Sequence, residues 1–81
     1  MIKFKEEFQL INVPSEIISN CNQLTIINIG TATAVLNGVD IAPGDQYVSP
    51  GNENEFNITN YRLSFAGVGT QIVMIIRKIY Q

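Results

Sequence analysis

The sequence predicts an all-β fold, a compact antiparallel β-sandwich or jelly roll of about seven or eight short strands. Isoleucine is the commonest residue, at 13 of 81 positions, and β-branched side chains favour strands over helices. Turn signals recur about every 8 to 12 residues. No segment requires a helix of ordinary length, and we found neither a linker nor an internal repeat. We therefore expect residues 1–81 to form a single β domain.

The N-terminal segment alternates in polarity. Ile2, Phe4, Phe8 and Leu10 share one parity, and Lys3 lies on the other. Alternation predicts a strand, although the spacing of the two phenylalanines also fits a helix. We expect residues 1–13 to form an N-terminal arm or edge strand that docks on a partner, because an open edge is a template for strand addition.

The segment 23–29 is predicted to be a strand with apolar side chains on both faces, so it should lie inside the fold or in an interface. After a break at Gly30-Thr31, residues 32–36 form the next predicted strand. Asn37-Gly38 then predicts a tight type I′ hairpin, since both residues accept positive φ. The short segment 15–19 is ambiguous.

The second half of the chain contains short strands separated by turns. Pro43-Gly44 fits a type II turn. Tyr61 to Phe65 alternates, with the aromatic and leucine side chains expected to point inward. The last strand, residues 71–80, has two apolar faces: Ile72, Met74 and Ile76 lie on one, and Val73, Ile75 and Ile79 on the other. The remaining predicted strands are 39–41 and 46–48, with a strand or bend at 56–58.

Composition excludes several classes of function. The net charge is −2 and only 15% of residues are charged, so there is no basic footprint for nucleic acid. The chain has no His and one Cys, Cys21, which excludes Ser-His-Asp and Cys-His catalysis and His-ligated metals. The longest apolar runs are far shorter than the roughly 20 residues of a membrane span. We expect no enzyme activity, no cofactor and no membrane partner.

Three candidate ligand sites have simpler explanations. Asp45 and the loop 52–55 offer oxygens for calcium, but their spacing matches no EF-hand, so they are interpreted as solvated loop residues. Gly67-Val68-Gly69-Thr70 lacks the Lys of a phosphate loop and is interpreted as a turn. An aromatic platform for sugar is a third candidate, for which core packing is the favoured interpretation; its members would be Tyr47, Tyr61, Phe65 and Tyr80.

From residue 23 onward the chain resembles a known type of protein. Residues 24–38 read LTIINIGTATAVLNG, residues 41–44 read IAPG, and residues 73–80 read VMIIRKIY. This pattern resembles small all-β virion structural proteins of tailed bacteriophages, including crAss-like phages of Bacteroidetes. The first 22 residues match nothing of this type. The resemblance implies a head decoration, auxiliary capsid or head-fibre protein that acts by association and has no catalytic residue.

The resemblance and the low charge together imply specific partners. We expect a homo-oligomer, a trimer ahead of a dimer, that also contacts other virion proteins such as the major capsid protein. Since the N-terminus does not read as a signal peptide, we expect synthesis in the host cytoplasm and a final place in the virion. A carbohydrate-binding or adhesin-like β domain is the alternative function. The expected interface residues are Ile2, Phe4, Phe8, Leu10, Ile27, Ile29, Val73, Ile75 and Ile79.

Overall fold

The computed structural model describes residues 1–81, which form eight β-strands and no helix. The all-β prediction is confirmed, and the helical alternative for the N-terminal segment is wrong. The strands are β1 (Phe4–Ile11), β2 (Ser15–Ile18), β3 (Gln23–Asn28), β4 (Thr33–Leu36), β5 (Val39–Ile41), β6 (Gln46–Ser49), β7 (Asn60–Ala66) and β8 (Val73–Tyr80).

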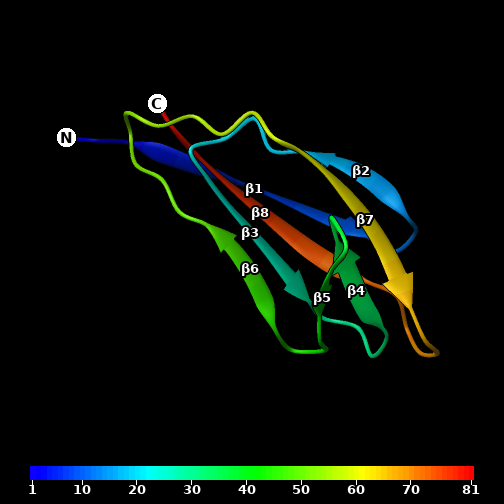
Figure 1. The fold of residues 1–81 in the computed structure, drawn as a ribbon. Helices are drawn as coiled ribbons and strands as arrows, with labels where there is room; N and C mark the ends of the chain where they lie inside the picture. The colour runs from blue at the N-terminus through cyan, green and yellow to red at the C-terminus, as the bar shows by residue number, and fades with distance from the viewer.

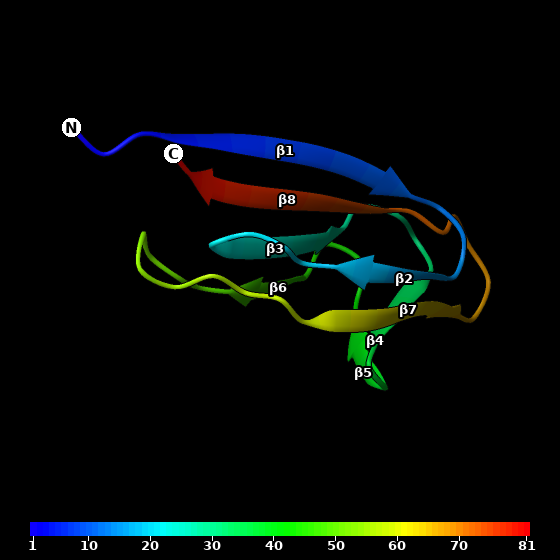
Figure 2. The same cartoon turned by 90° about the horizontal axis from the view of Figure 1, so that it is seen from above.

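The strands form two four-stranded antiparallel sheets (Figures 1 and 2). Sheet A has the order β1-β8-β3-β6, and sheet B has the order β2-β7-β4-β5. The principal axes measure 46 × 18 × 17 Å. The two longest strands, β1 and β8, lie side by side in sheet A, and the chain termini lie at the same end of this pair (Figure 2).

The strand pairs are nested along the chain. β4 pairs with β5, β3 with β6, β2 with β7, and β1 with β8. The chain is therefore one long hairpin whose successive pairs are assigned alternately to the two sheets. Contacts of β3 with β8 and of β4 with β7 join the pairs into complete sheets.

The tip of this long hairpin is the predicted Asn37-Gly38 turn. Asn37 has φ 50° and Gly38 has φ 82°, which are the positive values that a type I′ turn requires. The Asn37 side chain also accepts a hydrogen bond from the Arg62 backbone N–H at 2.7 Å, so the turn is tied to β7. The Pro43-Gly44 turn is confirmed as well, with Gly44 at φ 86° and the Asp45 N–H donating to the Ala42 carbonyl.

The core lies between the two sheets and is built mainly from one face of each strand. Tyr61 and Leu63 of β7 point into it, as predicted, with Phe65 packed against it. The core residues are Ile11, Ile17, Cys21, Leu24, Ile26, Ala34, Leu36, Ile41, Tyr61, Leu63, Val73 and Ile75. Because side chains alternate along each strand, the remaining side chains of sheet A point away from the core, onto the outer face of that sheet.

Buried asparagines hold the loops to the sheets. The Asn28 side chain is fully buried and donates to the carbonyls of Ala32 and Ile41, both at 2.9 Å. Asn22 donates to the carbonyls of Asn52 and Glu55 and accepts from the Tyr80 N–H. Every buried side-chain polar atom has a partner, so part of the high asparagine content is structural.

Candidate interaction surface

The outer face of sheet A is the face that points away from sheet B, and several large apolar side chains lie next to one another on it. Because strand side chains alternate, the neighbours of the core residues Leu24, Ile26, Val73 and Ile75 must point outward. This face consists of Phe4, Glu6, Phe8 and Leu10 of β1, Met74, Ile76, Lys78 and Tyr80 of β8, Gln23, Thr25 and Ile27 of β3, and Gln46 and Val48 of β6.

The centre of this face is continuous apolar surface. Phe8 lies opposite Ile76, Leu10 lies opposite Met74, and Met74 in turn lies opposite Ile27. Phe8 is 63% exposed and Leu10 is 62% exposed, although side chains of this kind prefer the interior. An apolar patch over several adjacent strands is typical of a surface that another molecule covers.

The end of the face near the termini combines aromatic rings with one charge of each sign. The rings of Phe4 and Tyr80 pack edge to face with centroids 5.9 Å apart. The Lys78 ammonium lies 4.2 Å from the Phe4 ring centroid, a cation–π distance. Glu6 lies opposite Lys78 in the register, so this end of the face carries no net charge.

The predicted interface residues fall into two groups. Phe4, Phe8, Leu10 and Ile27 lie on the outer face of sheet A. Ile2 and Ile29 are 61% and 48% exposed and lie just beyond the ends of β1 and β3. All six are therefore accessible to a partner.

The other group requires a correction. Val73 and Ile75 are fully buried in the core, so these two residues are not available as contacts. Ile79 is partly buried and packs against the core. The prediction selected the wrong face of β8, because both faces are apolar and periodicity alone does not say which one meets sheet B. Met74, Ile76 and Tyr80 occupy the outer face instead. They lie opposite Leu10, Phe8 and Phe4 in the β1–β8 register, a long-range pairing that no local signal in the sequence reveals.

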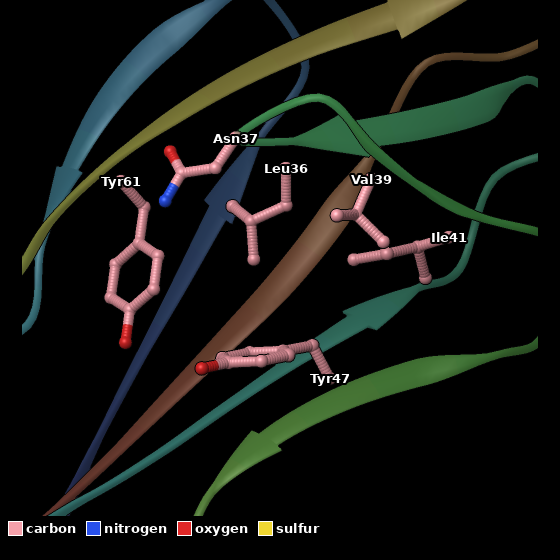
Figure 3. A pocket seen from close by; sticks show the side chains of 6 residues that line it. All are labelled: Leu36, Asn37, Val39, Ile41, Tyr47 and Tyr61. Atoms are coloured by element: carbon pink, nitrogen blue, oxygen red, sulfur yellow. The ribbon is translucent and has the colours of Figure 1, made fainter.

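A second feature is an apolar depression of about 190 Å³ beside the β4–β5 hairpin (Figure 3). Its lining is Leu36, Asn37, Val39, Ile41, Tyr47 and Tyr61. The two tyrosine rings pack edge to face with centroids 5.8 Å apart. Tyr61 is only 6% exposed, and Tyr80 belongs to the outer face of sheet A. The three tyrosines therefore do not form one platform.

The two phenols of the depression have different electrostatic environments. The hydrogen bond with Tyr61 raises the pKa of Tyr47, and burial raises it further. Burial alone would also raise the pKa of Tyr61. Hydrogen bonds with Asn57, Tyr47, Ser49 and Thr59 outweigh burial and lower the pKa of Tyr61. The Asn57 amide lies 3.2 Å from the Tyr61 hydroxyl. Both phenols carry hydroxyls that can form hydrogen bonds.

Neither the thiol nor the carboxylates form a reactive cluster. Cys21 is fully buried, and burial raises the pKa of its thiol. No three Cys, Asp or Glu side chains lie close enough to hold a metal ion. The structure has no helix of a length and hydropathy that would cross a membrane.

Comparison with known proteins adds no relative. No protein-family model, no curated protein and no solved structure matches this chain.

Proposed function

We propose that this chain is a non-enzymatic structural subunit of a bacteriophage virion, of the capsid decoration, auxiliary capsid or head-fibre type, that acts by protein–protein association. The observation that carries the proposal is the uncovered apolar outer face of sheet A. Its contacts would be with other virion proteins such as the major capsid protein. Assembly would take place in the host cytoplasm, where the subunit is made.

The strand order supports a jelly-roll fold, which is the finer description we propose for the two sheets. The nested pairs β1–β8, β2–β7, β3–β6 and β4–β5 are distributed over two sheets. Eight-stranded double-sheet jelly rolls occur in viral capsid and lectin domains. Since a fold does not determine a function, the strand order supports both the virion proposal and its alternative.

The chemistry of the outer face supports association over catalysis. A protein–protein interface needs a well-packed apolar centre with a polar rim. Phe8, Leu10 and Ile76 supply the centre, and Glu6 and Lys78 lie toward one end. A major capsid protein with an apolar surface patch would fit this face without meeting a net charge.

The test is co-sedimentation with assembled capsid shells, made by producing the chain together with the major capsid protein encoded in the same genome. We expect the chain to sediment with the shells. Ile76→Lys should abolish this binding, because it places a charge at the centre of the outer face of sheet A. The matched control is Val35→Lys on the outer face of sheet B, which should bind normally. The proposal fails if the chain stays in the supernatant, or if both variants bind equally well.

A carbohydrate-binding or adhesin-like role is the second candidate, favoured by the depression between Tyr47 and Tyr61. A volume of about 190 Å³ is below the roughly 300–1,000 Å³ of most ligand sites, so it would take one small group of a glycan. Binding on a glycan array that is lost in Tyr47→Ala and kept in Ile76→Lys would support this candidate. An array without signal would exclude it.

A further inference from the structure

We infer that the free edge of β1 pairs with β1 of a second copy, antiparallel and around a two-fold axis, to join two A sheets into one continuous eight-stranded sheet. This inference does not depend on a role in a virion, because it uses the strand edge and not the outer face.

The four sheet edges differ in how well they are protected against strand addition. Edges are usually protected by short strands, proline and charge. β2, β5 and β6 have three or four residues each. Each is also adjacent to one of the three prolines of the chain: Pro14 directly precedes β2, Pro43 follows β5 by two residues, and Pro50 directly follows β6. Only β1, with eight residues, presents a long edge, and the nearest proline, Pro14, lies three residues beyond its end.

The hydrogen bonds show which backbone groups of β1 face outward. The Gln81 N–H donates to the Lys3 carbonyl at 2.8 Å, and these two residues continue the β1–β8 register. Because bonded and non-bonded pairs alternate in an antiparallel ladder, Lys5, Glu7, Gln9 and Ile11 are the residues that bond to β8. The N–H and C=O groups of the even-numbered residues, Phe4, Glu6, Phe8 and Leu10, therefore point to the open edge.

The β8 backbone confirms this direction independently. The Lys78 carbonyl accepts from the Asn22 N–H, and the Tyr80 N–H donates to the Asn22 side chain. Even-numbered residues of β8 thus face β3, which leaves the odd-numbered residues to face β1. Along the whole open edge of β1, the outward-pointing N–H and C=O groups have no neighbouring strand to pair with.

Charge selects the register of the second copy. Two-fold pairings centred on Lys5, Glu6 or Glu7 would place identical charges directly opposite each other, which is destabilising. The longest pairing without such a clash is centred on Phe8 and spans residues 5–11 of both copies. It places Glu6 opposite Leu10 and Glu7 opposite Gln9 of the second copy. The Phe8 residues of the two copies exchange backbone hydrogen bonds on the axis.

The geometry leaves room for the second strand. Lys5, Glu7 and Gln9 point toward the sheet B side of β1, yet all three are exposed, so sheet B does not cover this edge. A two-fold axis perpendicular to the sheet keeps the outer faces of both copies on one side. The apolar surface of Phe8 and Leu10 then continues across the junction. Antiparallel pairing of two identical edges closes at two copies, which favours a dimer over the trimer expected from the sequence.

The first experiment measures mass against concentration by sedimentation equilibrium on the full chain. We expect the mass to double at high concentration and the dimer to dissociate on dilution, because a single strand pair is a small interface. Glu6→Pro should weaken the dimer at least about tenfold, since it removes an outward N–H that β8 does not use. The matched control is Glu7→Pro, which removes a donor to β8 and should lower the melting temperature instead.

The second experiment tests the register by disulfide formation. Glu7→Cys and Gln9→Cys proteins, mixed and oxidised, should form a mixed disulfide dimer, because these positions face each other across the pairing centred on Phe8. Glu7→Cys protein oxidised alone should remain uncrosslinked, and wild-type Cys21 is buried and serves as the background control. A monomer at every concentration, a trimer, or a dimer unchanged by Glu6→Pro would overturn the inference. Efficient crosslinking of Glu7→Cys alone would overturn the register.

Discussion

The two outer faces of the molecule differ in chemistry, although both belong to four-stranded antiparallel sheets. The outer face of sheet B carries Glu16 opposite Arg62, Ser64 opposite Val35, and Asp40 at its edge strand. The outer face of sheet A has Phe8, Leu10, Met74 and Ile76 at its centre. Charges occur on both outer faces, with Glu6 and Lys78 on that of sheet A, but the large apolar side chains lie next to one another at the centre of sheet A.

This difference bears on the proposed function more directly than composition does. A low overall charge is compatible with a weakly soluble monomer as well as with a subunit. A cluster of large apolar side chains at the centre of one outer face is typical of a surface that another molecule covers.

The largest effect should distinguish the two sides of β8. Ile75→Ala should lower the free energy of unfolding by about 2–5 kcal/mol, because Ile75 is fully buried and its truncation leaves a cavity. Ile76→Ala should cost clearly less in the isolated chain, since Ile76 lies on the outer face. Urea unfolding of both variants measures this difference. Equal losses would mean that the outer face is already covered in the isolated protein.

A similar comparison applies to polar residues. Asn28→Ala should cost about 1–3 kcal/mol, because it leaves the buried carbonyls of Ala32 and Ile41 without donors. Asn60→Ala, on the exposed outer side of β7, should change stability by less than about 0.5 kcal/mol. Thermal unfolding checks both variants. If Asn60→Ala costs as much as Asn28→Ala, the outer face of sheet B is not simply a solvated surface.

The sequence predicted the strands and turns well because their signals are local. Asn37-Gly38 and Pro43-Gly44 specify turns through their own backbone preferences, and the alternation of Tyr61 to Phe65 specifies its inward face. The pairing of β1 with β8 could not be read in this way, because it joins segments at opposite ends of the chain. Without that pairing, the two apolar faces of residues 73–80 are equivalent. For this reason, the sequence pattern alone predicts Val73, Ile75 and Ile79, and not Met74 and Ile76, as contact residues.

A dye that binds exposed apolar surface should report the same asymmetry in the native protein. Replacing Met74 and Ile76 together by Thr should reduce ANS fluorescence, while the strand propensity of Thr preserves the sheet. Val35→Thr on the outer face of sheet B should leave the fluorescence unchanged. An equal reduction in the two proteins would show that the apolar surface is not confined to sheet A.

The smallest effect concerns pH, and it should come from the core and not from either outer face. Burial raises the pKa of Cys21 above its ordinary value of 9.0. As pH rises past 9, the unfolded chain therefore loses the thiol proton before the folded chain does, and stability declines through the raised pKa. Melting temperatures between pH 8 and 10 should fall less in Cys21→Ala than in the wild type. Parallel declines would exclude the thiol as the cause.

The nested strand pairs also have a consequence for the order of folding. The Asn37-Gly38 turn brings β4 and β5 together across two residues, and each later pair must close a longer stretch of chain at a greater entropic cost. We expect the hairpin tip to form early and β1 to join β8 last. The strand with the most open edge is then also the last to find its place, so a newly made chain exposes that edge before its own β8 is complete. In crowded refolding, β1 is where one chain is most exposed to capture by another.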